Sequence, residues 1–296
     1  MLYKFKKLYY FIFALVLLSF VGHIGVGVRA KSVYDVPDKI VGDCAVTAGP
    51  RCRPAWRLRE GGKRFQATPF DWMKEYSLDT FINCYQNEFS DFFKEIKVIP
   101  KKGEKAHNGK KIHPFRKGSE DGDKSVHRQV KDTKNNIVSI HHFKDWISLE
   151  EGQADVREKM LRRGKKVIDI FKRSDTIILL SDRQEESLDD FKKFINKFSK
   201  LYPDKNITLV VVRNSNSNRV RKSVVYRGFA HQSGEKAANS ERKKLMIIQY
   251  SFKNANTEDK KYKWEGNDAG WEKVIGDIEL TDKIFGNHAN LSKVEY

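Results

Sequence analysis

The sequence has little cysteine. Its three cysteines are Cys44, Cys52 and Cys84, and they form neither a CxxC pair nor a Cys/His spacing typical of zinc sites. We therefore expect no bound metal ion and no cofactor. Because the count is odd, an oxidising compartment would leave one thiol free after one disulfide has formed. The identity of the free cysteine decides whether the chain can use a thiol for catalysis.

The sequence also lacks an arginine-rich tract interleaved with aromatic residues, so we expect no specific nucleic-acid binding. The chain nevertheless carries 57 Lys and Arg against 39 Asp and Glu, a formal charge of +18. Four of the basic residues lie in the first thirty positions, which leaves +14 on the remainder. A charge of this size favours anionic partners such as acidic lipid or an acidic protein surface. Because the charges are scattered through segments of mixed sign, a solvated basic surface is the simpler interpretation.

Charge of either sign is missing from Leu8 to Val28. Lys4, Lys6 and Lys7 precede an apolar run at Phe11–Phe20, and small residues lead to Val28-Arg29-Ala30. This order predicts a secretory signal peptide over residues 1–30, cleaved before Lys31. The uncharged stretch is also long enough to cross a bilayer, so an uncleaved membrane anchor is the alternative. Either way, the rest of the chain is expected outside the cytosol.

Strand and helix patterns alternate through the remainder of the sequence. Strands are predicted from β-branched or apolar runs, and helices from apolar residues at a spacing of three to four. In chain order these segments are a strand within Asp38–Val46, a helix from Pro54 closed by Gly61-Gly62, a helix at Ser77–Phe93, a strand at Asn136–Phe143, a helix at Gly152–Arg173, a strand at Asp175–Leu180, a helix at Ser187–Leu201, and strands at Asn206–Arg213 and Lys244–Phe252. The order predicts a single α/β domain over residues 31–280, with a central mixed or mostly parallel sheet flanked by helices, and a tail at 281–296.

Residues 101–131 are polar and rich in Lys, Gly, His and Asp, which predicts a long surface loop. His107, His113 and His127 lie in it, and so does Asp121-Gly122-Asp123, whose spacing matches the metal motif of many glycan transferases. Because these groups occupy a polar loop, we favour neither a metal site nor glycan transfer.

Cys52 is the strongest candidate for chemistry. It lies where the turn Ala48-Gly49-Pro50 meets a predicted helix, so its thiol faces unpaired N–H groups and the positive end of the helix. The neighbouring Arg51, Arg53 and Arg57 add to that field, and a lowered thiol pKa is expected. The same N–H groups could hold an oxyanion. A disulfide or a buried structural thiol is the alternative from the residues alone.

A histidine pair ends a predicted strand and could supply a base. Strand side chains alternate, so only one of His141 and His142 points into a given cleft. Val138 and Ile140 are predicted to face the core, which places His142 on their side. Asp132 or Asp182 could orient the imidazole, and the carboxyl end of a parallel strand slightly favours Asp182.

Part of the chain resembles a known family. The stretch Gly49-Pro50-Arg51-Cys52-Arg53-Pro54-Ala55-Trp56-Arg57-Leu58-Arg59, continuing to Pro69-Phe70-Asp71-Trp72, is similar to the opening of an uncharacterised family described as putative papain-like cysteine peptidases. The strand ending in His141-His142-Phe143 is similar to the histidine segment of that family. The resemblance implies Cys52 as nucleophile and favours His141 as base. In the family an arginine often follows the central strand, whereas here Ser181-Asp182 comes first. From the residues, Phe70 and Trp72 are expected to anchor the chain against the core, with Asp71 capping neighbouring backbone.

Two functions are therefore weighed. The first is a secreted cysteine-dependent hydrolase, a peptidase or acyl transferase acting on a peptide or acyl substrate. The second is a non-catalytic secreted binding module whose basic surface contacts anionic partners. For the first, Cys52 must stay a free thiol, so Cys44 and Cys84 should pair or be buried while Cys52 is exposed.

Overall fold

The computed structural model describes residues 34–99, 127–144, 147–230, 242–254 and 266–285. The helices are α2 (Cys52–Glu60), α3 (Leu78–Gln86), α4 (Leu149–Arg173), α5 (Leu188–Leu201), α6 (Asp268–Asp277) and α7 (Asp282–Phe285). The strands are β1 (Ile40–Gly42), β2 (Cys44–Thr47), β3 (Met73–Lys74), β4 (Ile96–Ile99), β5 (His127–Asp132), β6 (Ile137–Lys144), β7 (Thr176–Ser181), β8 (Asn206–Asn214), β9 (Arg221–Phe229), β10 (Lys244–Phe252) and β11 (Ile278–Leu280). The expected leader at residues 1–30, most of the expected loop at 101–131 and the tail beyond residue 285 lie outside the described residues.

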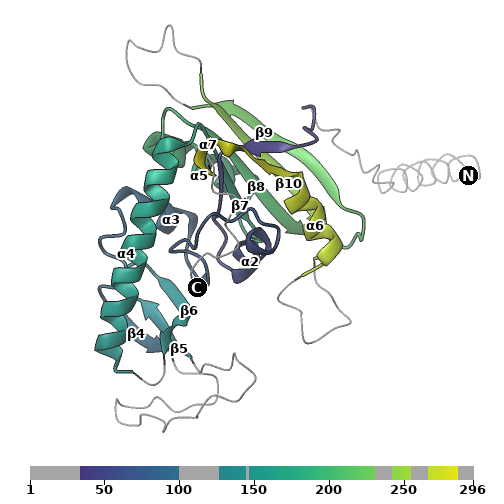
Figure 1. Cartoon of the computed structure of the whole chain (residues 1–296). Coiled ribbons are helices and arrows are strands. Elements are labelled where there is room, and N and C mark those ends of the chain that lie inside the picture. The colour runs from purple at the N-terminus through teal and green to yellow at the C-terminus, as the bar shows by residue number, and fades with distance from the viewer. Residues whose placement is uncertain (1–33, 100–126, 145–146, 231–241, 255–265, 286–296) are drawn as a thin grey trace, which may run out of the picture. The chain divides into compact units, whose positions relative to one another are not determined.

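A five-stranded sheet forms the centre of this fold, in the order β2-β7-β8-β10-β9 (Figure 1). The first four strands are parallel, and β9 pairs with β10 in the antiparallel direction. In the β7–β8 ladder Leu179 lies opposite Leu209. The buried apolar runs of β7 and β8 reflect strands that are covered on both faces. The predicted α/β class with a mixed central sheet is thus confirmed.

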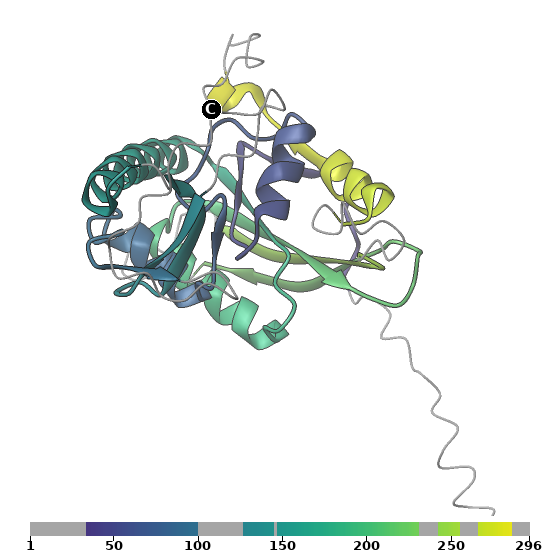
Figure 2. The same cartoon turned by 90° about the horizontal axis from the view of Figure 1, so that it is seen from below.

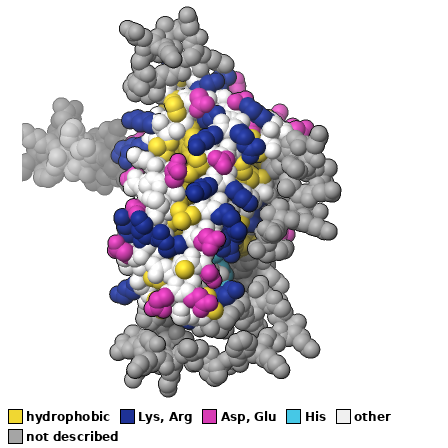
Figure 3. Space-filling view, turned by 60° about the vertical axis from the view of Figure 1, so that its left-hand side comes forward, with side chains coloured by type: hydrophobic (Ala, Val, Ile, Leu, Met, Phe, Trp, Pro, Cys, Tyr) yellow, Lys and Arg dark blue, Asp and Glu magenta, His cyan; other side chains and the backbone are white. Residues whose placement is uncertain are grey.

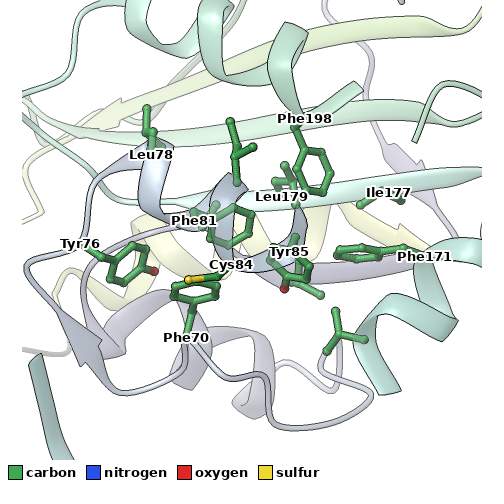
Figure 4. Packing of buried hydrophobic residues seen from close by; sticks show 14 of the residues in the cluster. Phe70, Tyr76, Leu78, Phe81, Cys84, Tyr85, Phe171, Ile177, Leu179 and Phe198 are labelled. Carbon is green, nitrogen blue, oxygen red and sulfur yellow. The ribbon is translucent and has the colours of Figure 1, made fainter. Parts of the chain in front are cut away.

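Helices cover both faces of the sheet, and alternate residues of each strand pack on opposite sides. In Figure 2 the purple and yellow helices α2 and α6 lie on one side of the strands and the green helix α5 on the other. On the α2 and α6 side, Leu58 and Trp271 pack with Ile178 and Leu180. The opposite face holds an aromatic cluster that contains Phe70, Tyr76, Phe81, Tyr85, Phe171 and Phe198 (Figure 4).

A second, antiparallel sheet in the order β3-β6-β5-β4 packs beside the long helix α4. Its ladders place Met73 opposite Ser139 and Asp132 opposite Ile137. This sheet matters for function because β6 carries the histidine pair, while α2 of the other layer carries Cys52.

One helix, one loop and two strands differ from the sequence-based expectation. The helix expected at Ser77–Phe93 ends at Gln86, because Glu88, Phe89 and Phe93 take left-handed backbone conformations that break the helical hydrogen-bond pattern. Residues 127–131 of the expected loop form most of β5, held by pairing on both sides with β4 and β6. The strands β4 and β9 were not predicted, since their exposed residues dilute the apolar pattern. Within the described part of the chain, no helix combines the length and apolarity that crossing a membrane requires.

Candidate functional site

Cys52 is the first residue of α2, directly after the turn that leaves β2. The residue before it, Arg51, is extended and gives no side-chain cap to the helix, and the first turn contains no acidic residue. The first N–H groups of a helix have no partner within the helix. At α2 they are therefore not occupied by a capping side chain, which leaves them suited to a developing oxyanion.

The turn before Cys52 is fixed by two buried side chains from distant segments. Tyr76 donates its hydroxyl hydrogen bond to the carbonyl oxygen of Gly49. Arg183, which is 5 % exposed, donates from Nε to the Ala48 carbonyl at 3.2 Å and from Nη2 to the Tyr76 carbonyl. The guanidinium also lies over the Tyr76 ring, 4.9 Å from its centroid. These contacts join β2, β3 and β7 around the thiol, so its position does not depend on the turn alone.

Asp182 lies beneath this turn, at the carboxyl end of β7. A Cβ atom on Gly49 would come within 2.8 Å of Asp182 Oδ1, so only glycine lets the carboxyl group pack there. The side chain is fully buried, and neither carboxyl oxygen has a hydrogen-bond partner among the described residues. Burial raises the pKa of Asp182, against the opposing charges of Arg53 and Arg51. The site therefore holds a buried acid whose neutral form is favoured, because burial outweighs the nearby arginines.

The Cys52 thiol is half-buried and protonated at neutral pH. Burial raises its pKa to about 11; the positive charge of Lys74 opposes this, and the negative charges of Asp182 and Asp71 add to it. The expected lowering of the pKa by the helix end and the arginines is thus corrected, since loss of solvent outweighs it. A nucleophilic Cys52 would need a base to take its proton.

Cys44 and Cys84 are buried free thiols. They were expected either to pair with each other or to be buried, and the second outcome is observed. Cys44 accepts a hydrogen bond from Ser174 Oγ at 3.3 Å, and burial raises its pKa to about 12. Cys84 lies in the aromatic cluster (Figure 4), and burial raises its pKa as well. Neither thiol competes with Cys52 for solvent-borne reagents, although Cys52 is half-buried rather than exposed.

The two histidines point to different surroundings. His141 is exposed, and its ring lies edge-on to Trp72 and to His127, at centroid distances of 5.5 and 5.9 Å. His142 is half-buried, but the predicted simple alternation does not hold there, because the β5–β6 register shifts at this point: Arg128 pairs with Phe143 and Val130 with Ser139. The Nδ1 of His142 lies 3.1 Å from Ser139 Oγ and its Nε2 lies 3.5 Å from Arg163 Nη1.

Burial, followed by the charges of Arg163 and Lys159, holds the pKa of His142 well below its usual value. The imidazole is therefore neutral, and one ring nitrogen faces a guanidinium donor. Of the described residues, neither histidine is hydrogen-bonded to Cys52.

The segment Phe70-Asp71-Trp72, called the Asp71 segment from here on, lies between Cys52 and the histidine strand. Asp71 is fully buried and accepts hydrogen bonds from Thr47 Oγ1 at 3.1 Å and from the N–H of Thr68 at 3.0 Å. Phe70 is buried among five aromatic rings. The predicted anchoring and capping roles of these two residues are confirmed. Trp72 is only half-buried and contacts His141 instead, with a left-handed backbone φ of 67° that is uncommon for a bulky residue.

Asp132 is not brought to the histidines. It lies opposite Ile137 at the far end of the β5–β6 ladder from His141, a separation of about 13 Å along the strand. Its carboxylate accepts from the N–H groups of Phe93 and Asn135 at 2.6 and 3.0 Å, which fixes the loops at that end. The structure therefore gives Asp132 a role in holding backbone, and places Asp182 close to Cys52.

Three residues of this site carry no motif in the sequence: Lys74, Tyr76 and Arg163. Lys74 and Tyr76 follow the Trp72 position closely, which is the one signal that could have drawn attention to them. Arg163 belongs to a helix with many basic residues, and nothing in the sequence singles it out. Arg183, by contrast, could have been found from the resemblance, which directs attention to an arginine after the central strand, although here Ser181-Asp182 comes first.

Comparison with known proteins identifies a family for this chain. A family model described as "Putative papain-like cysteine peptidase (DUF1796)" matches residues 43–221. The match includes Cys52, both histidines, Asp71, Asp182 and Arg183. No curated protein and no solved structure gives a significant match.

Proposed function

The chain belongs to the family of putative papain-like cysteine peptidases, and from this we propose that it is a secreted cysteine-dependent hydrolase with Cys52 as nucleophile. The observation that carries the proposal is the position of Cys52 at the start of a helix without a side-chain cap, in a turn clamped by Arg183 and Tyr76. Export is inferred from the leader pattern of residues 1–30 alone.

In the proposed reaction the Cys52 sulfur attacks the carbonyl carbon of a peptide or acyl substrate as a base takes the thiol proton. The oxyanion that forms is held by the N–H groups that open α2. Its collapse expels the leaving amine or alcohol, which receives the proton, and leaves a thioester on Cys52. Attack by water, or by an acceptor in an acyl transfer, then releases the acyl group and regenerates the thiol.

We assign the base to His141. The Nε2 of His142 faces the Arg163 guanidinium, which donates toward the lone pair that a base would need. His141 is exposed and lies against Trp72, next to the Asp71 segment that contacts the end of β2. The neutral thiol of Cys52 requires transfer of its proton during attack, and therefore closure of His141 onto the sulfur in the substrate complex. We propose that Asp182 does not orient the imidazole and instead acts on Cys52 itself, whose pKa is raised by burial and also by the buried carboxyl group of Asp182.

The test is formation of an acyl-enzyme. The protein is mixed with an activated ester, and the mass of the Cys52 peptide is followed with time. We expect a thioester adduct on Cys52, none in Cys52→Ala, and at least a hundredfold slower acylation in His141→Gln. With an uncharged ester, His142→Gln serves as the matched control on the same strand and should retain most of the rate. An equal rate in His141→Gln and the parent would contradict the assignment of the base.

The alternative function is a non-catalytic binding module on the same scaffold. The raised pKa of Cys52 and the lack of a histidine hydrogen bond to it favour this reading. It predicts that Cys52→Ala retains full function, and that binding to anionic vesicles falls steeply with salt. No acylation of Cys52 together with salt-sensitive vesicle binding would establish it over the hydrolase.

A further inference from the structure

Side chains from α4, β6 and the loop after α2 form a basic group near the Asp71 carboxylate. Lys159 and Arg163 are four residues apart on α4, so they project from the same face of that helix. Arg163 reaches β6, where its Nη1 lies 3.5 Å from His142 Nε2. Arg64 approaches from the loop after α2 and forms an ion pair with Asp71, Nη1 to Oδ2, at 3.4 Å. We refer to Arg64, His142, Lys159 and Arg163 as the basic cluster.

The cluster is held at an electrostatic cost. Lys159 and Arg163 are half-buried, and their like charges at an i,i+4 spacing repel each other. Burial first, and then the charge of Arg163, lowers the pKa of Lys159. Burial also lowers the pKa of Arg163, and the nearby Arg64 and Arg162 add to the effect. Figure 3 shows basic and acidic side chains interspersed over one face of the molecule.

The described residues offer the cluster too few acceptors. Within the described ranges no acidic side chain forms a salt bridge with Lys159 or Arg163. The nearby carboxylate of Asp71 already accepts from Thr47 and twice from Thr68. In the same loop as Arg64, the buried Nε2 of Gln66 has no acceptor among the described residues, and Arg64 Nη1 makes no hydrogen bond of good geometry. Buried donors in excess of acceptors call for a partner.

Asp71 connects the cluster with the thiol electrostatically. The Asp71 carboxylate acts both on Arg163, by favouring its charged form, and on Cys52, by favouring the neutral thiol. Asp71 is hydrogen-bonded to Thr47, the last residue of the strand that leads to Cys52. A group bound by the cluster would therefore lie on the side of Asp71 that faces β6 and α4.

We propose that the basic cluster binds an oxyanion group, a carboxylate or a phosphate, that the substrate of Cys52 carries near its reacting carbonyl. Arg163 supplies a planar pair of donors that matches such a group, and Lys159 supplies a mobile point charge. The substrate class is then an acidic acyl compound, such as a peptide with a carboxylate or a phosphate close to the scissile bond. This inference rests on the proposed function for the identity of the reacting residue, but the anion site can be tested without it.

The first experiment compares two thiol reagents of nearly equal size. Iodoacetate carries a carboxylate and iodoacetamide does not, and with both the Cys52 sulfur displaces iodide to form an S–C bond. We expect the ratio of the two rates, iodoacetate to iodoacetamide, to fall about tenfold in Arg163→Gln. Arg173→Gln is the control: it removes the same charge from the exposed end of the same helix, about 15 Å away, and should leave the ratio unchanged. An unchanged ratio in Arg163→Gln would overturn the proposal.

The second experiment measures anion binding in Cys52→Ala, which has no nucleophile. Its unfolding temperature is followed with sodium phosphate and, separately, with sodium acetate at constant ionic strength. A ligand of the folded state raises this temperature with concentration. We expect a rise that is lost when Arg163→Gln is added and kept when Arg173→Gln is added, and Lys159→Gln is the second variant should Arg163→Gln not fold. The anion that raises the unfolding temperature more shows whether the cluster prefers a phosphate or a carboxylate.

The two experiments separate the two proposals. If Cys52 fails to form an acyl-enzyme while phosphate or acetate still stabilises the protein through Arg163, the hydrolase is wrong and the anion site stands. If Cys52 is acylated but neither anion acts through Arg163 or Lys159, the hydrolase stands and the anion site is wrong.

Discussion

At the scale of single residues, Cys52 shows two opposing effects of its position. The helix start favours a thiolate, and burial next to Asp182 and Asp71 favours the thiol. With a pKa of about 11 the reactive form is scarce at neutral pH.

We therefore expect the alkylation of Cys52 by iodoacetamide to rise about tenfold per pH unit up to pH 10, with no plateau near the ordinary thiol pKa of about 8.5. Mass spectrometry of the Cys52 peptide over pH 6–10 measures this. The unfolded protein provides the reference, since its thiols should reach their plateau near pH 9. A plateau of the folded protein below pH 9 would mean that the helix end outweighs burial.

Asp182 provides a second residue-scale prediction. Because its pKa in the folded state is raised, its contribution to stability is fully present below the ordinary carboxyl pKa and is lost as pH rises through the folded pKa. Asp182→Asn removes that loss, so at pH 7 we expect an unfolding temperature equal to or a few degrees above the parent. The difference should shrink toward pH 4. If acylation of Cys52 is lost at the same time, Asp182 is kept for function at the expense of stability.

At the scale of elements, α4 depends on a glycine in its middle. A Cβ atom on Gly164 would lie 2.3 Å from Phe89 Cδ2, in the ring that anchors the left-handed turns after α3. Glycine costs a helix about 1 kcal/mol relative to alanine, so the packing of Phe89 against Gly164 must stabilise the fold by more than that.

Gly164→Ala should therefore lower the free energy of unfolding by about 1–3 kcal/mol despite the gain in helix propensity. Gly276 in α6 is the matched control, because a Cβ atom there meets nothing within 4 Å. Gly276→Ala should raise the free energy of unfolding by up to about 1 kcal/mol. Urea unfolding of both variants decides it, and a stabilised Gly164→Ala would show that Phe89 can move aside.

The elements also show how much of the fold and of the site could be predicted from the sequence. The apolar run at Asp175–Leu180 predicted β7, because a strand covered on both faces needs no alternation. The Gly-Pro turn before a helix predicted the place of Cys52, and the strand end predicted Asp182. Asp132 was a reasonable candidate by its closeness in sequence to the histidines, but the antiparallel turn of β5 into β6 sends it to the opposite end of the ladder.

The basic cluster could not be predicted, for a physical reason. Arg163 and Lys159 lie in a helix whose many charged residues predict a solvated face. Their burial comes from packing against β6 and the Asp71 segment, contacts between residues far apart in the chain. The pKa of Cys52 was misjudged for the same reason, since it is raised first by burial in the folded chain and then by acids from distant positions, Asp182 and Asp71.

At the scale of the whole molecule, the stability of the fold should depend on pH through His142. Its folded pKa lies below the ordinary value of 6.5, so the unfolded chain takes up a proton that the folded chain does not. The stability is present above pH 6.5 and is lost as pH falls below it, with a slope that approaches about 1.4 kcal/mol per pH unit for one proton. Asp43 and Asp277 have lowered pKa values and add a similar loss only below about pH 4.

His142→Gln should flatten the curve of unfolding free energy between pH 6.5 and 5, because glutamine does not titrate. Chemical unfolding at several pH values measures the slope. A slope that is equal in the variant and the parent would assign the pH dependence to other groups.

The clamp on the Cys52 turn has a consequence for the order in which the protein forms. Arg183 reaches carbonyl groups 135 and 107 positions away in the chain, at Ala48 and Tyr76. Closing such long loops is slow, so contacts of this kind form late on a folding pathway. The turn is made early during synthesis, but its supports arrive only after β7 has been added and docked. We expect a nascent or partly folded chain to be without a competent nucleophile until the domain is complete.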